Sequence, residues 1–215
     1  MKQFYSSKNQ VGYTCGIYCV EIANSIITNS PIEFDSYYNT IHNCIDKTYT
    51  KIGEVFDIDM LNTIACDFYQ NIETKVCDIT CVNDIDKLLN NFILVMPVLS
   101  EKTPHYIVLI KNENGSIRRY NDGLNFSSRK KLYKRNSRIK LEYIWPKNIL
   151  NGSFASKISE KVLIHNNEIL SYRQKYNENI FKAAKEKHII NIGDIDRVNM
   201  RGKCLIVSRA FKTGC

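Results

Sequence analysis

The chain has 215 residues, a net charge of +8 and 44% hydrophobic residues, with only 4 prolines and 9 glycines. This composition is typical of one globular domain, or of one domain with an appendage, and it excludes a largely disordered chain. No run of 18 apolar residues is present, so we expect no membrane span. The first residues lack the apolar core of a signal peptide, which favours a cytoplasmic location and is also compatible with secretion by a route without such a signal.

The first half of the chain has mainly helical patterns. After a loop that contains Gly12 and Thr14, apolar residues recur at helical spacing from Cys15 to residue 28, and Asn29-Ser30-Pro31 ends the pattern. Weaker patterns predict a short helix at 34–45, a helix at 58–68 capped by Asp57, a strand at 73–77, and a helix from an Asn83 cap to Asn90.

The period then changes to that of strands. The apolar run 92–99 predicts a buried strand, in which Pro97 should lie at an end or a bulge. We expect further elements at 105–110 (strand), 112–115 (hairpin turn), 116–120 and 139–145 (strands), 155–187 (long helix) and 204–208 (strand). Helices followed by a meandering antiparallel sheet predict an α+β fold. A boundary near 151–153 would separate a domain at 1–150 from a helical C-terminal extension at 151–215 of unknown role.

The eight cysteines are expected to be free thiols, because a chain of this size can bury a core without disulfides. Cys77 and Cys81 have a spacing that a zinc site could use, but no second pair of cysteines or histidines with comparable spacing follows. We therefore expect no metal and no cofactor.

Much of the positive charge is concentrated between residues 118 and 140. Such a region could attract an acidic peptide or protein. Aromatic residues are not interleaved with the basic ones as a stacking platform for bases would require, so the pattern favours an enzymatic function over nucleic-acid binding.

Cys15 is placed by the pattern in the first turn of a buried helix. Unsatisfied backbone N–H groups at this position favour an anion, so we expect the thiol to lose its proton more easily than an ordinary thiol. A small buried core residue is the equally ordinary interpretation. A nucleophilic role requires a base elsewhere in the chain.

His105 is the best candidate for that base among the four histidines. It begins an apolar strand directly after Pro104, at a strand end that faces a loop, where catalytic groups tend to lie. His42 lies in a polar stretch, and His165 and His188 lie in a charged helical segment, where solvated histidines are expected.

The returning strand of the hairpin brings Asn121 and Asp122 towards His105, and either could accept a hydrogen bond from the imidazole. A two-residue turn at Asn114-Gly115 would put Asp122 on the face of His105, whereas a three-residue turn closed by a left-handed Gly115 would put Asn121 there. Both turns are compatible with these residues.

An acyl-transfer site also needs donors for the developing oxyanion. The backbone N–H of Cys15 is one candidate, and the side-chain amide of Gln10 or Asn9 is another.

Taken together, these residues resemble the papain-like cysteine peptidases. The resemblance is closest to the family that removes double-glycine leader peptides from bacteriocins, including relatives without a transporter. It spans about residues 5–125 and rests on Gln10, Cys15-Gly16, Met96-Pro97-Val98, the strand His105-Tyr106-Ile107-Val108-Leu109, and Asn121.

The resemblance implies a cysteine-dependent peptidase with Cys15 as nucleophile, His105 as acid–base residue, Asn121 orienting the histidine and Gln10 as oxyanion donor. The gap from Gln10 to Cys15 is one residue shorter than is usual in the family, and the family's usual aspartate is replaced by Asn121, with Asp122 as the alternative. By family spacing we prefer Asn121, which implies the three-residue turn. Alternatives are an acyltransferase with the same site, a protease that removes ubiquitin-like modifiers, and a catalytically inactive binding module.

Overall fold

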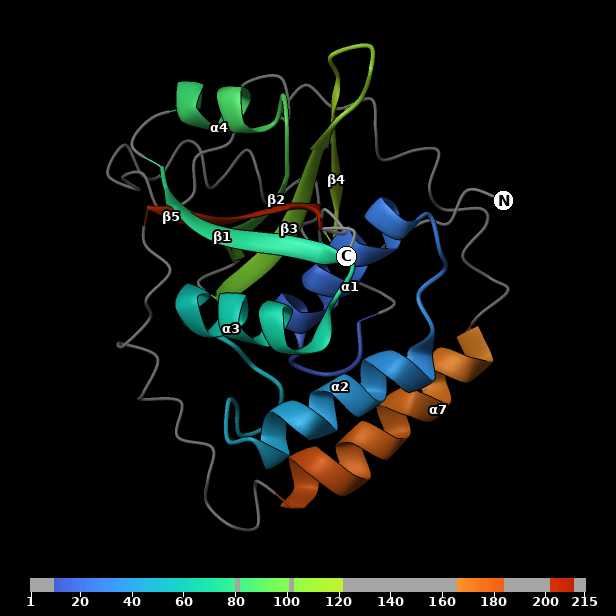
Figure 1. Ribbon diagram of the computed structural model, residues 1–215. Helices are drawn as coiled ribbons and strands as arrows, with labels where there is room; N and C mark the ends of the chain where they lie inside the picture. Colours follow the sequence, from blue (N-terminus) through green and yellow to red (C-terminus); the bar gives the residue numbers. More distant parts are fainter. Residues whose placement is uncertain (1–9, 80–81, 101–102, 122–165, 184–201, 211–215) are drawn as a thin grey trace, which may run out of the picture.

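The structure is a computed structural model that describes residues 10–79, 82–100, 103–121, 166–183 and 202–210. Its strands form one antiparallel sheet in the order β1-β5-β2-β3-β4, and helices lie on both sides of it (Figure 1). The strands are β1 (Ile72–Asp78), β2 (Ile93–Ser100), β3 (Thr103–Lys111), β4 (Ile117–Tyr120) and β5 (Lys203–Arg209). The helices are α1 (Cys15–Thr28), α2 (Phe34–Asp46), α3 (Ile58–Phe68), α4 (Val82–Leu88) and α7 (Asn166–Tyr176), which continues into the π-helical segment η3 (Asn177–Phe181). The predicted α+β class is confirmed.

Both faces of the sheet are buried, as the continuous apolar runs of β2 and β3 predict. Successive side chains of a strand point to opposite faces, so each strand contributes to two separate cores. Val95, Tyr106 and Val108 pack with α1, α2 and α3. Leu94 and Ile107 pack with α4 residues on the other side.

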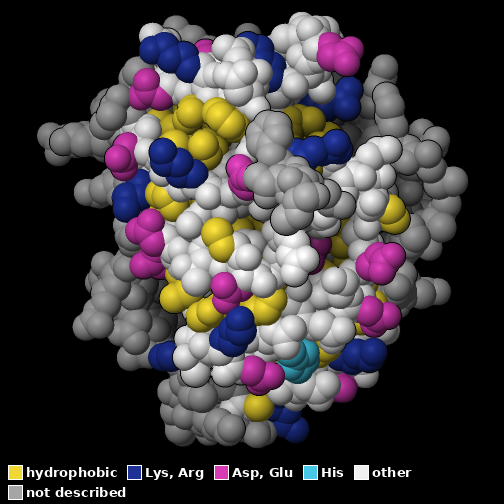
Figure 2. Space-filling model, viewed as in Figure 1, with side chains coloured by type: hydrophobic (Ala, Val, Ile, Leu, Met, Phe, Trp, Pro, Cys, Tyr) yellow, Lys and Arg dark blue, Asp and Glu magenta, His cyan; other side chains and the backbone are white. Residues whose placement is uncertain are grey.

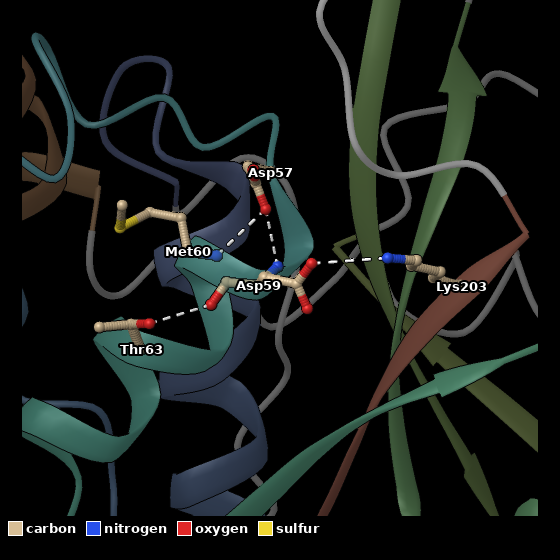
Figure 3. A network of polar contacts seen from close by, with 5 residues as sticks. All are labelled: Asp57, Asp59, Met60, Thr63 and Lys203. Atoms are coloured by element: carbon tan, nitrogen blue, oxygen red, sulfur yellow. Dashed lines mark hydrogen bonds and ion pairs between the residues drawn. The ribbon is translucent and has the colours of Figure 1, made fainter.

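Most of the helix starts and ends lie where the sequence predicts them. α1 begins at Cys15 and ends at residue 28 as the pattern indicates. Asp57 caps α3: its Oδ1 accepts from the backbone N–H groups of Asp59 (2.8 Å) and Met60 (3.2 Å) (Figure 3). The predicted Asn83 cap is wrong, because α4 already begins at Val82 and Asn83 lies inside the helix.

Pro97 lies within β2, not at a strand end or bulge as we expected. It is paired with Tyr106 of β3, whereas the ladder between β2 and β5 ends at Val95. In the described part of the chain Pro97 therefore has a strand partner on one side only. A proline can occupy such a position because its missing N–H need not interrupt a ladder on both sides.

The C-terminal part of the chain contributes to the same core as the N-terminal part. β5 lies between β1 and β2, so the segment after residue 151 supplies an internal strand in addition to a helix. Asp59 at the start of α3 forms an ion pair with Lys203 of β5 (3.5 Å; Figure 3). The expected boundary near residue 151 and the strand at 139–145 lie outside the described residues.

α7 lies alongside α2 on the side of the molecule away from the sheet (Figure 1). The Tyr172 hydroxyl donates to Asp35 of α2 (2.5 Å), and the Tyr172 ring is stacked on Phe34 with the centroids 5.8 Å apart. The observed helix covers part of the long helical pattern that we predicted at 155–187.

Lys and Arg side chains are mixed with Asp and Glu side chains across the face shown in Figure 2. Most of the predicted basic region at 118–140 lies outside the described residues. None of the helices that the structure describes is long and apolar enough to cross a membrane.

Candidate active site

The start of α1 is fixed by a closed set of hydrogen bonds around Thr14. The Thr14 hydroxyl donates to the carbonyl of Val11 (2.5 Å), and the Val11 N–H donates to the Tyr37 hydroxyl (3.4 Å). The Thr14 and Tyr37 hydroxyls also contact each other, and Tyr37 must be the donor because the only hydroxyl proton of Thr14 is already used. Thr14 therefore does not cap α1 with its side chain, which leaves the N–H groups of the first turn for other acceptors.

Cys15 is the first residue of α1, and its side chain is buried. Burial raises the pKa of the Cys15 thiol from 9.0 to about 11, although hydrogen bonds from the backbone N–H groups of Tyr106 and Gly16 oppose the increase. The expectation of an easily lost proton is therefore wrong for this state of the protein, because desolvation outweighs the field of the helix terminus. The thiol needs a base to become a thiolate at neutral pH.

Gly16 allows the start of α1 to lie close to β3. A Cβ atom at this position would lie 3.2 Å from Leu61 Cδ1 and 3.3 Å from the ring of Tyr106. Tyr106 follows His105 in β3, and its N–H contacts the Cys15 thiol. The thiol is therefore close to the backbone of the residue next to the predicted base.

His105 has its Nε2 atom 2.6 Å from the backbone carbonyl oxygen of Asn121. A carbonyl oxygen can only accept, so Nε2 carries the proton in this contact. In the neutral imidazole Nδ1 is then the nitrogen that can take up a proton. We expected the side chain of Asn121 or Asp122 to orient the imidazole. For Asn121 the contact comes from its main-chain carbonyl, and Asp122 lies outside the described residues.

The hairpin between β3 and β4 has the three-residue turn. Lys111 pairs with Ile117, the Asn112 N–H donates to the Ser116 carbonyl (2.8 Å), and Gly115 has a φ of 78°. This register is the one that we preferred. It places Asn121 immediately after the last residue of β4, and Asp122 lies outside the described residues.

Asn121 leaves the strand in a left-handed conformation with a φ of 58°, and it is completely buried. Its side chain therefore does not follow the alternating directions of side chains in a strand, and it contacts α1. The Nδ2 atom contacts the carbonyl of Tyr106 (3.1 Å), Oε1 of Gln10 (3.2 Å) and Sγ of Cys19 (3.4 Å). Its Oδ1 atom has no hydrogen-bond partner among the described residues.

Gln10 takes part in one of these contacts through its side-chain amide. Its Oε1 accepts from Asn121, and its Nε2 donates one proton to the carbonyl of Gly12 (2.7 Å). Nε2 carries a second proton, with which it can donate one further hydrogen bond. The structure thus brings Gln10 and Asn121 into direct contact, and it connects Asn121 to α1 and to His105.

Sequence reasoning missed three residues that contact this group: Cys19, Arg173 and Tyr176. Cys19 is completely buried, and its contact with Asn121 was not foreseen. Arg173 and Tyr176 contact the loop around Gln10 from more than 160 positions along the chain. The only signal for Arg173 and Tyr176 in the sequence was the helical pattern that contains them. Such a pattern does not indicate which segment the helix contacts.

A family model described as "Actin maturation protease-like, C-terminal domain" matches residues 5–102, a little under half of the chain. The match includes Gln10 and Cys15 and ends before His105. It supports a relationship to papain-like cysteine proteases, and it does not support the bacteriocin leader-peptidase family. No curated protein and no solved structure matches the chain.

Proposed function

We propose that the protein is a cysteine-dependent peptidase that cleaves an amide bond of a peptide or protein, with Cys15 as nucleophile and His105 as acid–base residue. The observation that carries the proposal is the 2.6 Å contact between Nε2 of His105 and the carbonyl of Asn121. This contact leaves Nδ1 of His105 as the basic nitrogen. The next residue, Tyr106, contacts the Cys15 thiol through its backbone N–H.

The proposed reaction begins with transfer of the Cys15 proton to His105. The thiolate then attacks the carbonyl carbon of the substrate, and the oxyanion accepts hydrogen bonds from the backbone N–H of Cys15 and the second Nε2 proton of Gln10. His105 returns the proton to the leaving amine, and a thioester remains on Cys15. His105 then takes a proton from water, whose oxygen attacks the thioester carbon. The C–S bond breaks, the acid leaves, and His105 returns the proton to the Cys15 thiolate.

A catalytically inactive binding module is the second candidate. It is favoured by the burial of Cys15, which is only 8% exposed and has a pKa raised to about 11. In such a module Cys15 would be a core thiol and His105 a residue at the sheet edge. The two candidates differ in whether His105 changes the reactivity of Cys15.

The experiment is hydrolysis of a panel of peptides, followed by mass spectrometry. The panel contains peptides that cover the actin sequence because of the family's name, and a double-glycine leader peptide because of the resemblance noted above. It also contains a ubiquitin-like C-terminal extension and a random peptide library. Added amines in parallel samples separate hydrolysis from acyl transfer. We expect cleavage by the wild-type protein and none by Cys15→Ala or His105→Ala.

Cys66→Ser is the matched control, because Cys66 is an exposed cysteine far from the site in sequence. It should retain full activity. Cleavage that persists in Cys15→Ala would contradict the proposal. Unfolding of both site variants, seen by circular dichroism, would indicate core residues and would also contradict it.

A further inference from the structure

The C-terminal helix contacts the loop that leads to the candidate nucleophile. Nε and Nη2 of Arg173 in α7 both donate to the backbone carbonyl of Gln10, each over 3.2 Å. The planar guanidinium thus directs two N–H groups at one oxygen, which restricts the position of that peptide group. The side chain of the same Gln10 is bonded to Asn121 and Gly12.

Tyr176, one turn further along α7, contacts the other end of this loop. Its hydroxyl accepts from the N–H of Tyr13 (3.4 Å) and donates to the carbonyl of Ile52 (2.8 Å). The side chain is completely buried, and its ring covers Gly12 so closely that a Cβ atom there would lie 2.1 Å from the ring. Gly12 has a φ of 58°, so both the conformation and the space at this position require glycine.

The same helix also has an anchor that does not involve the loop. Tyr172 is bonded to Asp35 and stacked on Phe34, both in α2. At the far end, the ring of Phe181 in η3 lies 5.5 Å from the ring of Tyr13, measured between centroids. The helix is therefore attached to α2 on one side and to the loop 10–13 on the other.

We propose that α7 positions the loop 10–13 for catalysis, with Arg173 and Tyr176 as positioning residues. This inference rests on the proposed peptidase function. The loop carries the candidate oxyanion donor Gln10 and runs directly into Cys15, so a shift of the loop would change the donor geometry. Because misplacement by about 1 Å can reduce a rate by about 100-fold, contacts of this kind determine turnover without touching the substrate.

The test uses the full chain with three variants. Arg173→Ala removes both bonds to Gln10, and Arg173→Lys retains the charge but can only direct a single ammonium at the carbonyl. Tyr176→Phe retains the ring but loses the bonds to Tyr13 and Ile52. Gln174→Ala is the matched control, since Gln174 is an exposed residue of the same helix whose side chain donates to Glu178 (2.9 Å). Tyr172→Phe weakens the anchor on α2 without removing a contact to the loop.

Four quantities are measured for each variant: kcat and KM on a cleaved peptide, the rate of Cys15 alkylation, and the rate of hydrogen exchange at the Tyr13 amide. We expect Arg173→Ala to lower kcat at least about 10-fold with KM within about twofold. Arg173→Lys should restore part of the loss, and Tyr176→Phe should increase exchange at Tyr13. Gln174→Ala should match the wild type.

Wild-type kcat in Arg173→Ala, together with unchanged exchange at Tyr13 in Tyr176→Phe, would overturn the inference while leaving the peptidase proposal intact. An equal loss in Tyr172→Phe would also overturn it, because general docking of the helix would then be sufficient. If the wild-type protein cleaves no peptide, the peptidase proposal fails, and the alkylation and exchange rates still decide whether α7 positions the loop.

Discussion

The side-chain amide of Asn121 donates to Oε1 of Gln10 over 3.2 Å, and so connects the end of β4 to the loop before α1. The two residues are 111 positions apart in the chain. The same nitrogen also contacts the carbonyl of Tyr106 and the sulfur of Cys19. Asn121 therefore acts as a donor to several acceptors, whereas its backbone carbonyl is the group that meets His105.

This arrangement predicts that Asn121→Asp is more harmful than Asn121→Gly. A carboxylate would face the oxygens of Gln10 and Tyr106 without a proton to donate, and an unsatisfied buried group of this kind costs about 1–3 kcal/mol. Glycine loses the donor but accepts the positive φ and retains the carbonyl next to His105. Peptide hydrolysis should decrease in the order wild type, Gly, Asp.

The opposite order would show that the side-chain oxygen of residue 121 orients the imidazole, as an aspartate can. Urea denaturation of both variants provides the control. It separates a loss of activity in a folded protein from a loss of folded protein.

Gly12→Ala should destabilise the protein by roughly 2–5 kcal/mol, since overpacking costs about 1–3 kcal/mol and a left-handed alanine about 1–2 kcal/mol. The new Cβ would lie 2.1 Å from the Tyr176 ring, which must move and take α7 with it. Thermal unfolding measures the loss. Gly115→Ala is the control, because Gly115 also has a positive φ but has no atom within 4 Å of the added Cβ.

If Gly12→Ala lost no more stability than Gly115→Ala, backbone strain alone would account for both losses. The close packing of Tyr176 on the loop would then have no energetic consequence. A difference between the two variants isolates the contribution of the contact.

Glu21 of α1 predicts a pH-dependence of stability. Its side chain is buried and accepts from the Tyr69 hydroxyl (2.9 Å), and burial raises its pKa from 4.5 to about 7. The folded state thus binds the carboxyl proton of Glu21 more tightly than the unfolded state does. The stability that this proton contributes is fully present below pH 4.5 and is lost as the pH rises through 7. The free energy of unfolding should fall by roughly 3 kcal/mol across this range from this group.

Glu21→Gln should remove that fall, because the amide oxygen still accepts from Tyr69 and carries no charge. Urea denaturation at several pH values between 4 and 9 measures it. The control is Glu73→Gln, at an exposed carboxyl of β1, which should leave the wild-type pH-dependence in place. A Glu21→Gln protein with the same pH-dependence as the wild type would contradict the assignment.

The elements with strong local patterns could be predicted from the sequence. Apolar spacing placed α1, and the Asp57 cap placed the start of α3, because both signals depend on residues within one or two helical turns. The Asn83 cap failed for a related reason. Asparagine is common at helix caps but is also tolerated inside helices, and here α4 begins at Val82, one residue before Asn83.

The long-range arrangement could not be predicted in the same way. β5 lies between β1 and β2, and an apolar run of this length is compatible with many positions in a sheet. The hairpin register was narrowed to two possibilities by Asn114 and Gly115. The role of Asn121 depends on its positive φ, which no periodic pattern records.

The direction of the Cys15 pKa shift was also beyond the sequence. A helix N-terminus lowers the pKa of a thiol, but burial raises it, and their balance depends on how closely α1 lies against β3. Gly16 allows this close approach, since a Cβ atom there would lie only 3.2 Å from Leu61 and 3.3 Å from the Tyr106 ring. With a pKa raised to about 11, the Cys15 thiol is almost fully protonated at neutral pH, so the proposed nucleophile requires a base.

The most direct test is the rate of Cys15 alkylation by iodoacetamide as a function of pH, mapped by mass spectrometry, in the wild type and in His105→Ala. The exposed Cys66 is the internal reference in each sample. If His105 takes the proton of Cys15, the wild type should react at pH 7 at least about 10-fold faster than the variant, whose rate should rise only as the pH approaches 11. Identical profiles for the two proteins, both rising near pH 11, would contradict the proposed peptidase site.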